Sequence, residues 1–261
     1  MESLVIIKIG GNVMDDEFAL NSFLTQFSAI TSKKILIHGG GKQATKIGEQ
    51  LGIQTNYING RRITDEKTID LVTMVYAGLV NKRMVAGLQS KGCNAIGLTG
   101  ADANIIPAVK RPVKAIDYGF VGDINEAIDG RKLDIFLTNS LVPVIAPLTH
   151  DGKGQLFNTN ADTIASAIAA AFTGVYEVRL VYCFEKKGVL EDISDENSVI
   201  RVITKDVYRR LLMEGKLADG ILPKIDNAFS AIGLGVRQVV IGDAGNLREN
   251  CSEQITGTLL I

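Results

Sequence analysis

The sequence predicts an α/β protein in which helices cover both faces of a parallel sheet. Short apolar runs rich in β-branched residues recur along the first half of the chain, and segments with helical spacing separate them. Several of these runs end in glycines that lead directly into the next helix. With 261 residues, of which 46% are apolar, the chain can bury the core of one large domain or of two lobes.

The first expected strand, residues 4–9, reads Leu-Val-Ile-Ile-Lys-Ile, which is typical of a strand buried on both faces. Lys8 interrupts the apolar run, and Gly10 and Gly11 follow at once. A buried lysine needs an anion, and two glycines let a ligand reach bare backbone N–H groups. The stretch indicates a phosphate site. A lysine that reaches water at the rim of an ordinary sheet is an equally good interpretation.

The second expected strand, residues 35–38, ends in Gly39-Gly-Gly41, and a helix is expected over residues 42–51. A strand, glycines and a helix in this order direct backbone donors and a helix dipole at an anion. Lys42 does not make the stretch a P-loop, because the GxxxxGK[ST] spacing is absent. The alternative is that the three glycines form a tight connection that binds no ligand. Glycine turns follow both early strands, which makes this alternative weaker.

The rest of the chain continues the alternation of strands and helices. Asp65 and Thr204 are expected to cap the helices that follow them. Prolines and glycines between residues 105 and 124 predict hairpins, which we interpret as a lid over a site. The further helices are expected at 16–30, 65–90, 130–139, 164–172, 204–214 and 225–233, and the further strands at 94–98, 141–146, 178–183, 238–241 and 257–261.

Polar side chains gather before two of the later helices. Asn158, Asn160 and Asp162 precede the helix at 164–172, and because one cap needs one such side chain, the surplus suggests ligand contacts. Lys224 lies at the start of another helix, where a cation opposes the dipole. An anion held there explains its position better than a stray surface lysine does.

Two adjacent arginines, Arg61 and Arg62, occupy the turn that begins at Asn59. A solvated charged turn and a fork for a carboxylate are the two interpretations. The sequence alone favours the solvated turn.

Composition narrows the classes of function. A net charge of −1 gives no electrostatic reason to expect a nucleic acid or an anionic membrane as partner. Three scattered cysteines show no disulfide framework or metal spacing, which indicates a reducing cytoplasm, and two histidines exclude a histidine-rich zinc site. No metal site is expected. No signal peptide is expected, because no basic region precedes the first apolar run and that run is too short. No membrane span is expected, because the longest apolar runs fall short of about 20 residues.

Five stretches together resemble the motifs of the amino acid kinase family, in order and over essentially the whole chain. Each motif alone is weak evidence for the family, whereas five motifs in the family's order are strong evidence. They are Lys8-Ile-Gly-Gly11, His38-Gly-Gly-Gly41, Asn59-Gly-Arg-Arg62, Asn158-Thr-Asn-Ala-Asp162 and Gly220-Ile-Leu-Pro-Lys224.

The resemblance implies a single domain over residues 1–261, built as a three-layer αβα sandwich around a mainly parallel sheet of about eight strands. The first lobe, to about residue 173, would bind an acyl amino acid, and the second, from about residue 174, would bind ATP. The implied reaction is ATP-dependent phosphorylation of the γ-carboxylate of an N-acyl-L-glutamate such as N-acetyl-L-glutamate, an early step of arginine or ornithine synthesis. Mg²⁺ would come with ATP, and no tightly bound cofactor is implied.

The resemblance also gives roles to residues of this sequence. Lys8 and Lys224 would flank the transferring phosphoryl group, and Asp162 would hold both lysines in position. Gly40 and Gly41 would bind the acyl amino acid with their backbone N–H groups. Arg62 and Asn158 would bind the α-carboxylate of the acyl amino acid. The residues that would bind the nucleotide are Gly10, Gly11, Glu185, Lys186, Gly188 and Leu190.

This sequence departs from the family pattern in three places. Phe184 and Glu185 stand where the family has a Thr/Ser-Asp pair, which would alter nucleotide binding. The unusual lid, residues 110–123, leaves the acyl group open between acetyl and a larger one such as succinyl. The chain also begins directly at its first strand, which implies a homodimer without arginine feedback.

Two other functions stay open on the sequence. One is a family kinase for another carboxylate or for carbamate. The other is a regulatory or binding protein that kept the fold and lost ATP. The altered pair Phe184-Glu185 favours the binding protein, whereas Lys8, Asp162 and Lys224 favour an enzyme.

Overall fold

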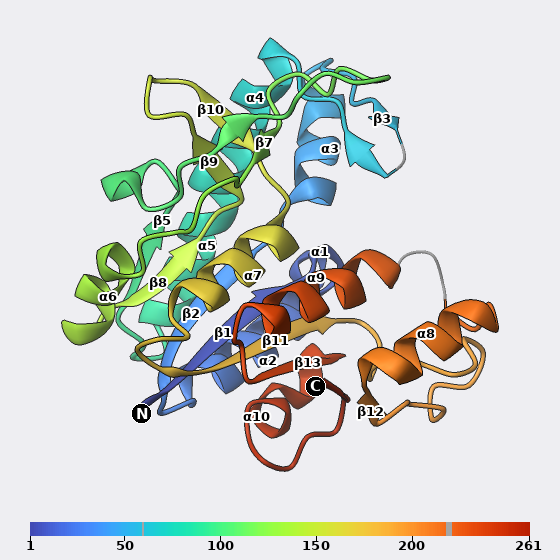
Figure 1. Ribbon diagram of the computed structural model, residues 1–261. Coiled ribbons are helices and arrows are strands. Elements are labelled where there is room, and N and C mark those ends of the chain that lie inside the picture. The colour runs from blue at the N-terminus through green and yellow to red at the C-terminus, as the bar shows by residue number, and fades with distance from the viewer. Residues whose placement is uncertain (59, 218–220) are drawn as a thin grey trace. The chain divides into compact units, whose positions relative to one another are not determined.

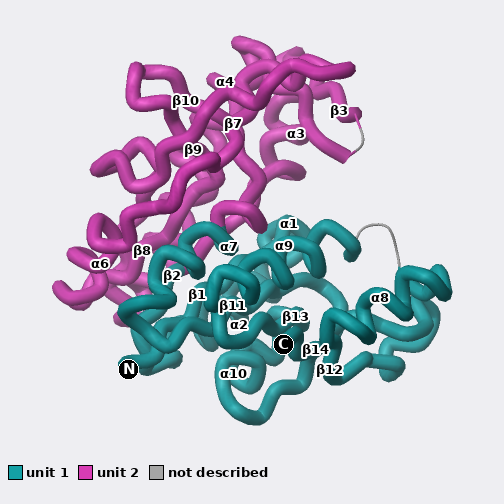
Figure 2. Tube along the Cα trace, viewed as in Figure 1, with its two compact units in different colours: residues 1–35, 165–261 teal, residues 36–164 magenta. Residues whose placement is uncertain are grey.

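The computed structural model describes residues 1–58, 60–217 and 221–261 and divides into two compact units. Unit 1 comprises residues 1–35 and 165–261, and unit 2 comprises residues 36–164, as Figure 2 shows. The expected division of the two ligands between a first and a second lobe stays a prediction.

The central sheet has eight strands, in the order β12-β14-β13-β11-β1 for unit 1 and β2-β8-β5 for the strands that end in unit 2 (Figure 1). Of the described pairs, β13 with β14 is antiparallel and the others are parallel. The predicted αβα architecture with a mainly parallel sheet is confirmed. The strands are β1 (Ser3–Ile9), β2 (Lys33–His38), β5 (Ala95–Leu98), β8 (Val142–Ile145), β11 (Glu177–Phe184), β12 (Val202–Ile203), β13 (Gln238–Asp243) and β14 (Thr258–Leu260).

The predicted helices form with the expected caps. The Asp65 carboxylate accepts from Thr68 N at 2.8 Å, and the Thr204 hydroxyl accepts from Val207 N at 3.2 Å. Such caps satisfy N–H groups that have no partner inside the helix. The helices are α1 (Gly11–Asp15), α2 (Glu17–Ser28), α3 (Gly41–Gln50), α4 (Glu66–Val72), α5 (Asn81–Gln89), α6 (Arg131–Thr138), α7 (Ala161–Ala171), α8 (Lys205–Met213), α9 (Leu222–Gly233) and α10 (Leu247–Asn250).

The helix expected over residues 65–90 is continuous, but its middle third, Thr73–Val80, is a π-helix. This run reads Thr-Met-Val-Tyr-Ala-Gly-Leu-Val and buries Val75, Tyr76 and Val80. The wider π turn changes which side chains share a face, and such turns are frequent at functional sites. Here it belongs to the helix that packs beside α3 and carries Tyr76.

Two helices begin three residues earlier than predicted. Helix α7 begins at Ala161 rather than at 164, and α9 begins at Leu222 rather than at 225. Apart from Leu222, the additional residues are polar, small or proline, so apolar spacing did not mark these two helix starts. The short elements α1, α10 and β12 were also not predicted, because runs of two to five residues show little periodicity.

Unit 2 contains three small antiparallel pairs besides its part of the central sheet. The pairing of β6 with β7 confirms a hairpin within the predicted lid. The pairing of β9 with β10 was not predicted. The strands are β3 (Tyr57–Ile58) with β4 (Arg61–Arg62), β6 (Val109–Lys110) with β7 (Gly122–Asp123), and β9 (Leu148–His150) with β10 (Leu156–Asn158).

The core of unit 1 lies around β1 and its partner β11. Five of the seven β1 residues are buried, as expected for a strand covered on both faces. Tyr182 of β11 donates to or accepts from Ser166 of α7 at 2.7 Å, and the Ser166 hydroxyl lies 3.4 Å from Asn227 O of α9. Helices α7 and α9 therefore share the sheet face on which Tyr182 lies (Figure 1).

Three further findings concern the described residues as a whole. Cys93, Cys183 and Cys251 are free thiols. In the described ranges, no helix combines the length and the apolar character needed to cross a membrane. Within the same ranges, no three His, Cys, Asp or Glu side chains gather in a way that could hold a metal ion.

Candidate active site

The turn after β1 is fixed at one glycine and open at the next. Gly10 N donates to Cys183 O at 2.9 Å, which pins the turn to β11. A Cβ at Gly10 would lie 3.3 Å from the same carbonyl oxygen, whereas a Cβ at Gly11 would meet no heavy atom within 4 Å. Backbone at Gly11 is thus accessible to a ligand, beside the half-buried Lys8 at the end of β1.

The two lysines predicted to flank the phosphoryl group lie at the same edge of unit 1. Lys8 is in register with Tyr182, so the two side chains lie on one face of the sheet. That face also holds α9, through Ser166 and Asn227. Helix α9 leads into β13 and runs antiparallel to the strands, so its first turn, with Lys224, lies where β1 ends.

The segment predicted to bind the nucleotide follows β11. Glu185 is exposed, and Lys186 forms an ion pair with Glu196 at 3.1 Å. Phe184 is the last residue of β11, and its Cβ lies 3.7 Å from the position of a Cβ at Gly10. The phenylalanine that replaces a hydroxyl residue of the family pattern therefore packs against the glycine turn.

Gly188 and Leu190 have a structural role in the same segment. A Cβ at Gly188 would lie 2.7 Å from the Thr258 hydroxyl, which itself accepts from Val189 N at 2.8 Å. Leu190 is buried and bridges to Val199. These contacts fix the chain beside β14, and a role of the two residues in nucleotide binding stays a prediction.

The turn after β2 is held by a buried polar network. His38 is fully buried, and its Nδ1 lies 2.6 Å from Gly39 O. Asn81 Nδ2 lies 3.1 Å from His38 Nε2 and donates to Val144 O at 2.9 Å. Because a carbonyl only accepts and an amide nitrogen only donates, the imidazole is neutral with its proton on Nδ1. Burial lowers the pKa of His38 to about 4, which keeps it neutral.

This network orients the glycine backbone. In a trans peptide the C=O and N–H groups point in opposite directions. Because the imidazole holds Gly39 O, the N–H of Gly40 points away from His38. A Cβ at Gly40 would lie 2.6 Å from Tyr76 Cδ1, so only glycine fits against that ring. Gly41 then begins α3, whose first turn presents backbone N–H groups.

Arg62 is a buried cation at the start of α3 and is 6% exposed. Its Nη2 donates to Gly41 O at 2.7 Å and to the Thr45 hydroxyl at 2.9 Å, and Nη1 donates to the Thr55 hydroxyl at 2.8 Å. All three acceptors are neutral, so no carboxylate among the described residues balances the guanidinium. The solvated turn that the sequence favoured is therefore wrong for Arg62, whereas Arg61 is exposed as expected.

The three polar residues around the start of α7 make different contacts. Asn160 is the cap, since its Oδ1 accepts from Asp162 N at 2.8 Å and from Thr163 N at 3.0 Å. Asn158 Nδ2 donates to the Thr64 hydroxyl at 3.1 Å. Asp162 is 8% exposed and lies in the first turn of α7, where the helix dipole favours its charge. Its predicted contact with the two lysines stays a prediction.

Two predicted motifs are only partly described. Asn59 and residues 218–220 lie outside the described residues, so Asn59 and Gly220, the first residues of their motifs, are not placed. Arg62 and Lys224, the last residues of the same motifs, are placed, in β4 and in α9.

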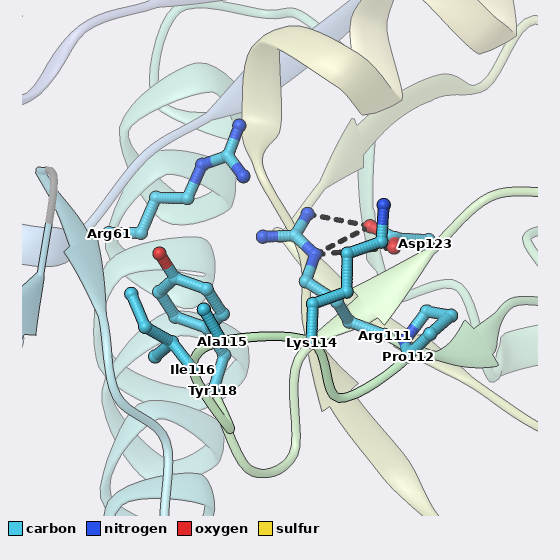
Figure 3. Close-up of a pocket in the computed structure, with 8 residues that line it drawn as sticks. All are labelled: Arg61, Arg111, Pro112, Lys114, Ala115, Ile116, Tyr118 and Asp123. Atoms are coloured by element: carbon cyan, nitrogen blue, oxygen red, sulfur yellow. Dashed lines mark hydrogen bonds and ion pairs between the residues drawn. The ribbon is translucent and has the colours of Figure 1, made fainter.

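The sequence did not reveal a pocket in unit 2. A pocket of about 480 Å³, shown in Figure 3, lies between the strand β4 and the lid. Two basic residues around a proline in the lid, in Arg111-Pro-Val-Lys114, are the sequence signal that could have indicated it. The lining residues are Arg61, Arg111, Pro112, Lys114, Ala115, Ile116, Tyr118 and Asp123.

Residues 3–243 match the model of the amino acid kinase family. The chain is 55% identical to the acetylglutamate kinase of Phocaeicola vulgatus, over 95% of this chain and 96% of that one. It is 53% identical to the acetylglutamate kinase of Cytophaga hutchinsonii, over 100% of this chain and 99% of that one. The acetylglutamate kinase of Methanopyrus kandleri is 37% identical over 94% of this chain and 96% of that one.

Solved structures share the fold over nearly the whole chain. The smu.665 protein of Streptococcus mutans matches with a TM-score of 0.79 at 28% identity, over 98% of each chain. N-acetylglutamate synthase of Neisseria gonorrhoeae matches with 0.82 at 22% identity, over 99% of this chain and 59% of that one. Carbamate kinase of Giardia lamblia matches with 0.72 at 14% identity, over 99% and 98%, and these last two show the fold alone. Because the family model covers most of the sequence and the relatives align along its full length, the chain belongs to the amino acid kinase family.

Proposed function

We propose that this protein phosphorylates the γ-carboxylate of an N-acyl-L-glutamate with ATP, in the synthesis of arginine or ornithine. Relatives named acetylglutamate kinase, at 53% to 55% identity over nearly the full length, support the reaction class. Lys8, Asp162 and Lys224, to which the family resemblance gives roles in phosphoryl transfer, are all present in this sequence.

The observation that supports the acyl amino acid most strongly is the surroundings of Arg62. A buried guanidinium whose acceptors are all neutral is costly unless an anion binds beside it. It lies at the first turn of α3, whose N–H groups also favour an anion. A guanidinium and a helix start together fit the α-carboxylate of a glutamate, since Arg binds carboxylates with a planar fork.

The phosphoryl group is assigned to unit 1. The lysine ammonium groups of Lys8 and Lys224, at one edge of the sheet, would offset the charge of the transferring phosphoryl group. The open backbone at Gly11 would donate to the phosphates of ATP. Mg²⁺ would enter bound to those phosphates and would neutralise part of their charge. Asp162 would hold the lysines rather than accept a proton.

The proposed chemistry needs no general base. An oxygen of the γ-carboxylate already carries the electron pair that attacks the γ-phosphorus of ATP. The bond from that phosphorus to the β,γ-bridging oxygen breaks, and ADP leaves with the electron pair. The product is an acyl phosphate. Positioning and charge stabilisation therefore account for the catalysis, as in other phosphoryl transfers.

A coupled assay of ADP release tests the proposal, with N-acetyl-L-glutamate and N-succinyl-L-glutamate as substrates and hydroxylamine to trap the acyl phosphate as a hydroxamate. We expect ADP to appear only with an acyl glutamate and in equal amount to the hydroxamate. Measurable binding without turnover of either compound would support a binding protein instead. Release of ADP with carbamate alone would support the other kinase.

We propose further that the enzyme acts as a homodimer in the cytoplasm. The three free thiols fit a reducing compartment. Light scattering after size exclusion gives the mass in solution, and we expect twice the mass of 28.1 kDa for one chain. A mass of 28.1 kDa would contradict the dimer.

A further inference from the structure

The pocket shown in Figure 3 has an unbalanced charge. Arg61 reaches it from β4, whereas Arg111 and Lys114 reach it from the lid, and Asp123 is the one acid among the lining residues. That acid is already occupied, because Arg111 Nε and Nη2 donate to Asp123 Oδ1 at 3.0 and 2.6 Å. The lining therefore has a charge of about +2 that comes from Arg61 and Lys114.

These two cations have no partner in the protein as described. Over residues 1–58, 60–217 and 221–261, neither the Arg61 guanidinium nor the Lys114 ammonium forms a hydrogen bond or an ion pair. The guanidinium groups of Arg61 and Arg111 extend toward each other from opposite sides of the pocket (Figure 3). Cations that converge on one concavity repel each other, and an anion between them removes the repulsion.

The pocket is linked to the residues proposed to bind the acyl amino acid through the strand β4 and its backbone contacts. Successive side chains of a strand point to opposite sides, so Arg62 points to α3 while Arg61 points into the pocket. The lid is joined to this strand end, since Thr64 N donates to Tyr118 O at 2.9 Å and Phe120 N donates to Thr64 O at 2.7 Å. The Thr64 hydroxyl in turn accepts from Asn158.

The same backbone pairing extends to the end of β10. Asn158 N donates to Phe120 O at 2.9 Å, and Arg111 N donates to Val121 O at 2.7 Å. A substrate held by Arg62 and Asn158 through its α-carboxylate would therefore have the lid, with its cations, as a neighbour. The N-acyl group is the part of such a substrate that is free to extend in that direction.

The size and lining of the pocket exceed the needs of an acetyl group. Beyond its amide carbonyl an acetyl group has a single methyl group, whereas the pocket has a volume of about 480 Å³. Ile116 and Tyr118 offer apolar surface for methylene groups, and the cations offer partners for a terminal charge. We propose that Arg61 and Lys114 bind a carboxylate at the far end of the N-acyl group, so that the preferred substrate carries a dicarboxylic acyl group such as succinyl. This inference rests on the proposed acylglutamate kinase function.

The test compares kcat/KM for three substrates of one enzyme: N-acetyl-L-glutamate, N-succinyl-L-glutamate and the neutral amide of the latter, N-succinamoyl-L-glutamate. We expect kcat/KM for the succinyl compound to exceed both others by about ten-fold or more, because a charge-assisted pair is lost in each of them. Equal values for the succinyl compound and its neutral amide would overturn the inference.

Variants assign the effect to the pocket. Arg61→Gln and Lys114→Gln should each lower the ratio of kcat/KM for succinyl over acetyl substrate by about ten-fold. The matched control is Lys153→Gln, which removes an exposed cation of unit 2 outside the pocket and should leave the ratio unchanged. Because the ratio is taken within one variant, a loss of folded enzyme cancels. A ratio that Arg61→Gln and Lys114→Gln leave unchanged would overturn the assignment.

The outcomes separate this inference from the function on which it rests. Turnover of N-acetyl-L-glutamate that equals or exceeds turnover of the succinyl compound contradicts the pocket alone. No turnover of any acyl glutamate contradicts the kinase as well. A further experiment adds free succinate to the assay with N-acetyl-L-glutamate. If succinate alters the turnover while the enzyme shows no preference for the succinyl substrate, the pocket binds a separate anion and the inference is wrong.

Discussion

Glycines follow both β1 and β2 and lead into a helix, yet the cation beside each glycine turn comes from a different part of the chain. At the turn after β1, the cation is Lys8 of the strand itself, and the next helix has five residues. At the turn after β2, the strand ends in the neutral His38, and the cation is Arg62 from a separate strand. The helix that follows this second turn has ten residues.

The difference suggests two tasks for one backbone pattern. The second turn is held by three side chains, because His38 and Arg62 contact Gly39 O and Gly41 O and the Tyr76 ring packs against Gly40. Such a turn suits a group that must be held in one orientation, as a substrate carboxylate must. The first turn leaves space at Gly11 beside the half-buried Lys8, which suits a group that moves during the reaction.

The largest expected effect is the loss of the Lys8 ammonium. Lys8→Met should lower kcat by about 10²-fold or more and leave KM for the acyl glutamate nearly unchanged, because the charge acts on the transferring group. The measurement is steady-state ADP release with both substrates varied. Lys205→Met, which removes an exposed lysine of α8, serves as the control. A kcat within a few-fold of wild type would remove Lys8 from the mechanism.

Substitution of Arg62 should change KM for the acyl glutamate rather than kcat. Arg62→Gln should raise KM for the acyl glutamate by about 10- to 100-fold, because the carboxylate loses a charge-assisted bidentate partner. Arg62→Lys keeps the charge and loses the planar fork, so it should restore only part of the affinity. Isothermal titration with the acyl glutamate alone checks the effect. Unchanged affinity in both variants would contradict the assignment of the turn.

The buried imidazole makes the second turn sensitive to pH. In the unfolded chain His38 takes up a proton below its ordinary pKa of 6.5, whereas the folded pKa is about 4. The unfolded state therefore binds more protons in this window, and stability falls as the pH falls. Between about pH 7.5 and about pH 5 the loss from His38 should be about 2 kcal/mol.

The measurement is urea unfolding at several pH values, compared between the wild type and His38→Gln. The variant should lose less stability than the wild type over the same pH range. His150→Gln, at the chain's second histidine, is the matched control for the loss of an imidazole. Identical pH dependence in His38→Gln and the wild type would show that the imidazole is not held neutral.

The smallest expected effect compares the glycines directly. Gly40→Ala should lower the free energy of unfolding by at least about 1 kcal/mol, because its Cβ would overlap the Tyr76 ring. Gly11→Ala should change it by less than about 0.5 kcal/mol, since space is open there. Gly11→Ala should nevertheless slow turnover, because the methyl occupies the approach of the phosphates. Equal losses of stability would remove the structural difference between the turns.

The features that could be predicted from the sequence are those with a local pattern, namely buried strands, glycine turns and helix caps. The buried β1, the glycines after β1 and β2, and the caps at Asp65 and Thr204 all follow from local patterns. The family motifs added the architecture and the names of the site residues. Local pattern also explains the error at Arg62, because a turn with two arginines looks solvated until α3 and Thr55 are placed beside it.

The remaining features depend on contacts between distant residues. The network of His38 with Asn81 joins residues 43 positions apart, and no spacing in the chain indicates it. The π-helix at Thr73–Val80 reads as an ordinary apolar helical run. The pocket forms only when the lid pairs with the backbone at Thr64, which brings Arg61 near Arg111.

Amide hydrogen exchange with each ligand separately tests the central claim most directly. An N-acyl-L-glutamate should slow exchange at residues 39–45, in the turn after β2, and a non-hydrolysable ATP analogue should slow it at residues 10–15, in the turn after β1. Protection of residues 10–15 by the acyl glutamate, with residues 39–45 unchanged, would contradict the assignment of the carboxylate to one turn and the phosphoryl group to the other.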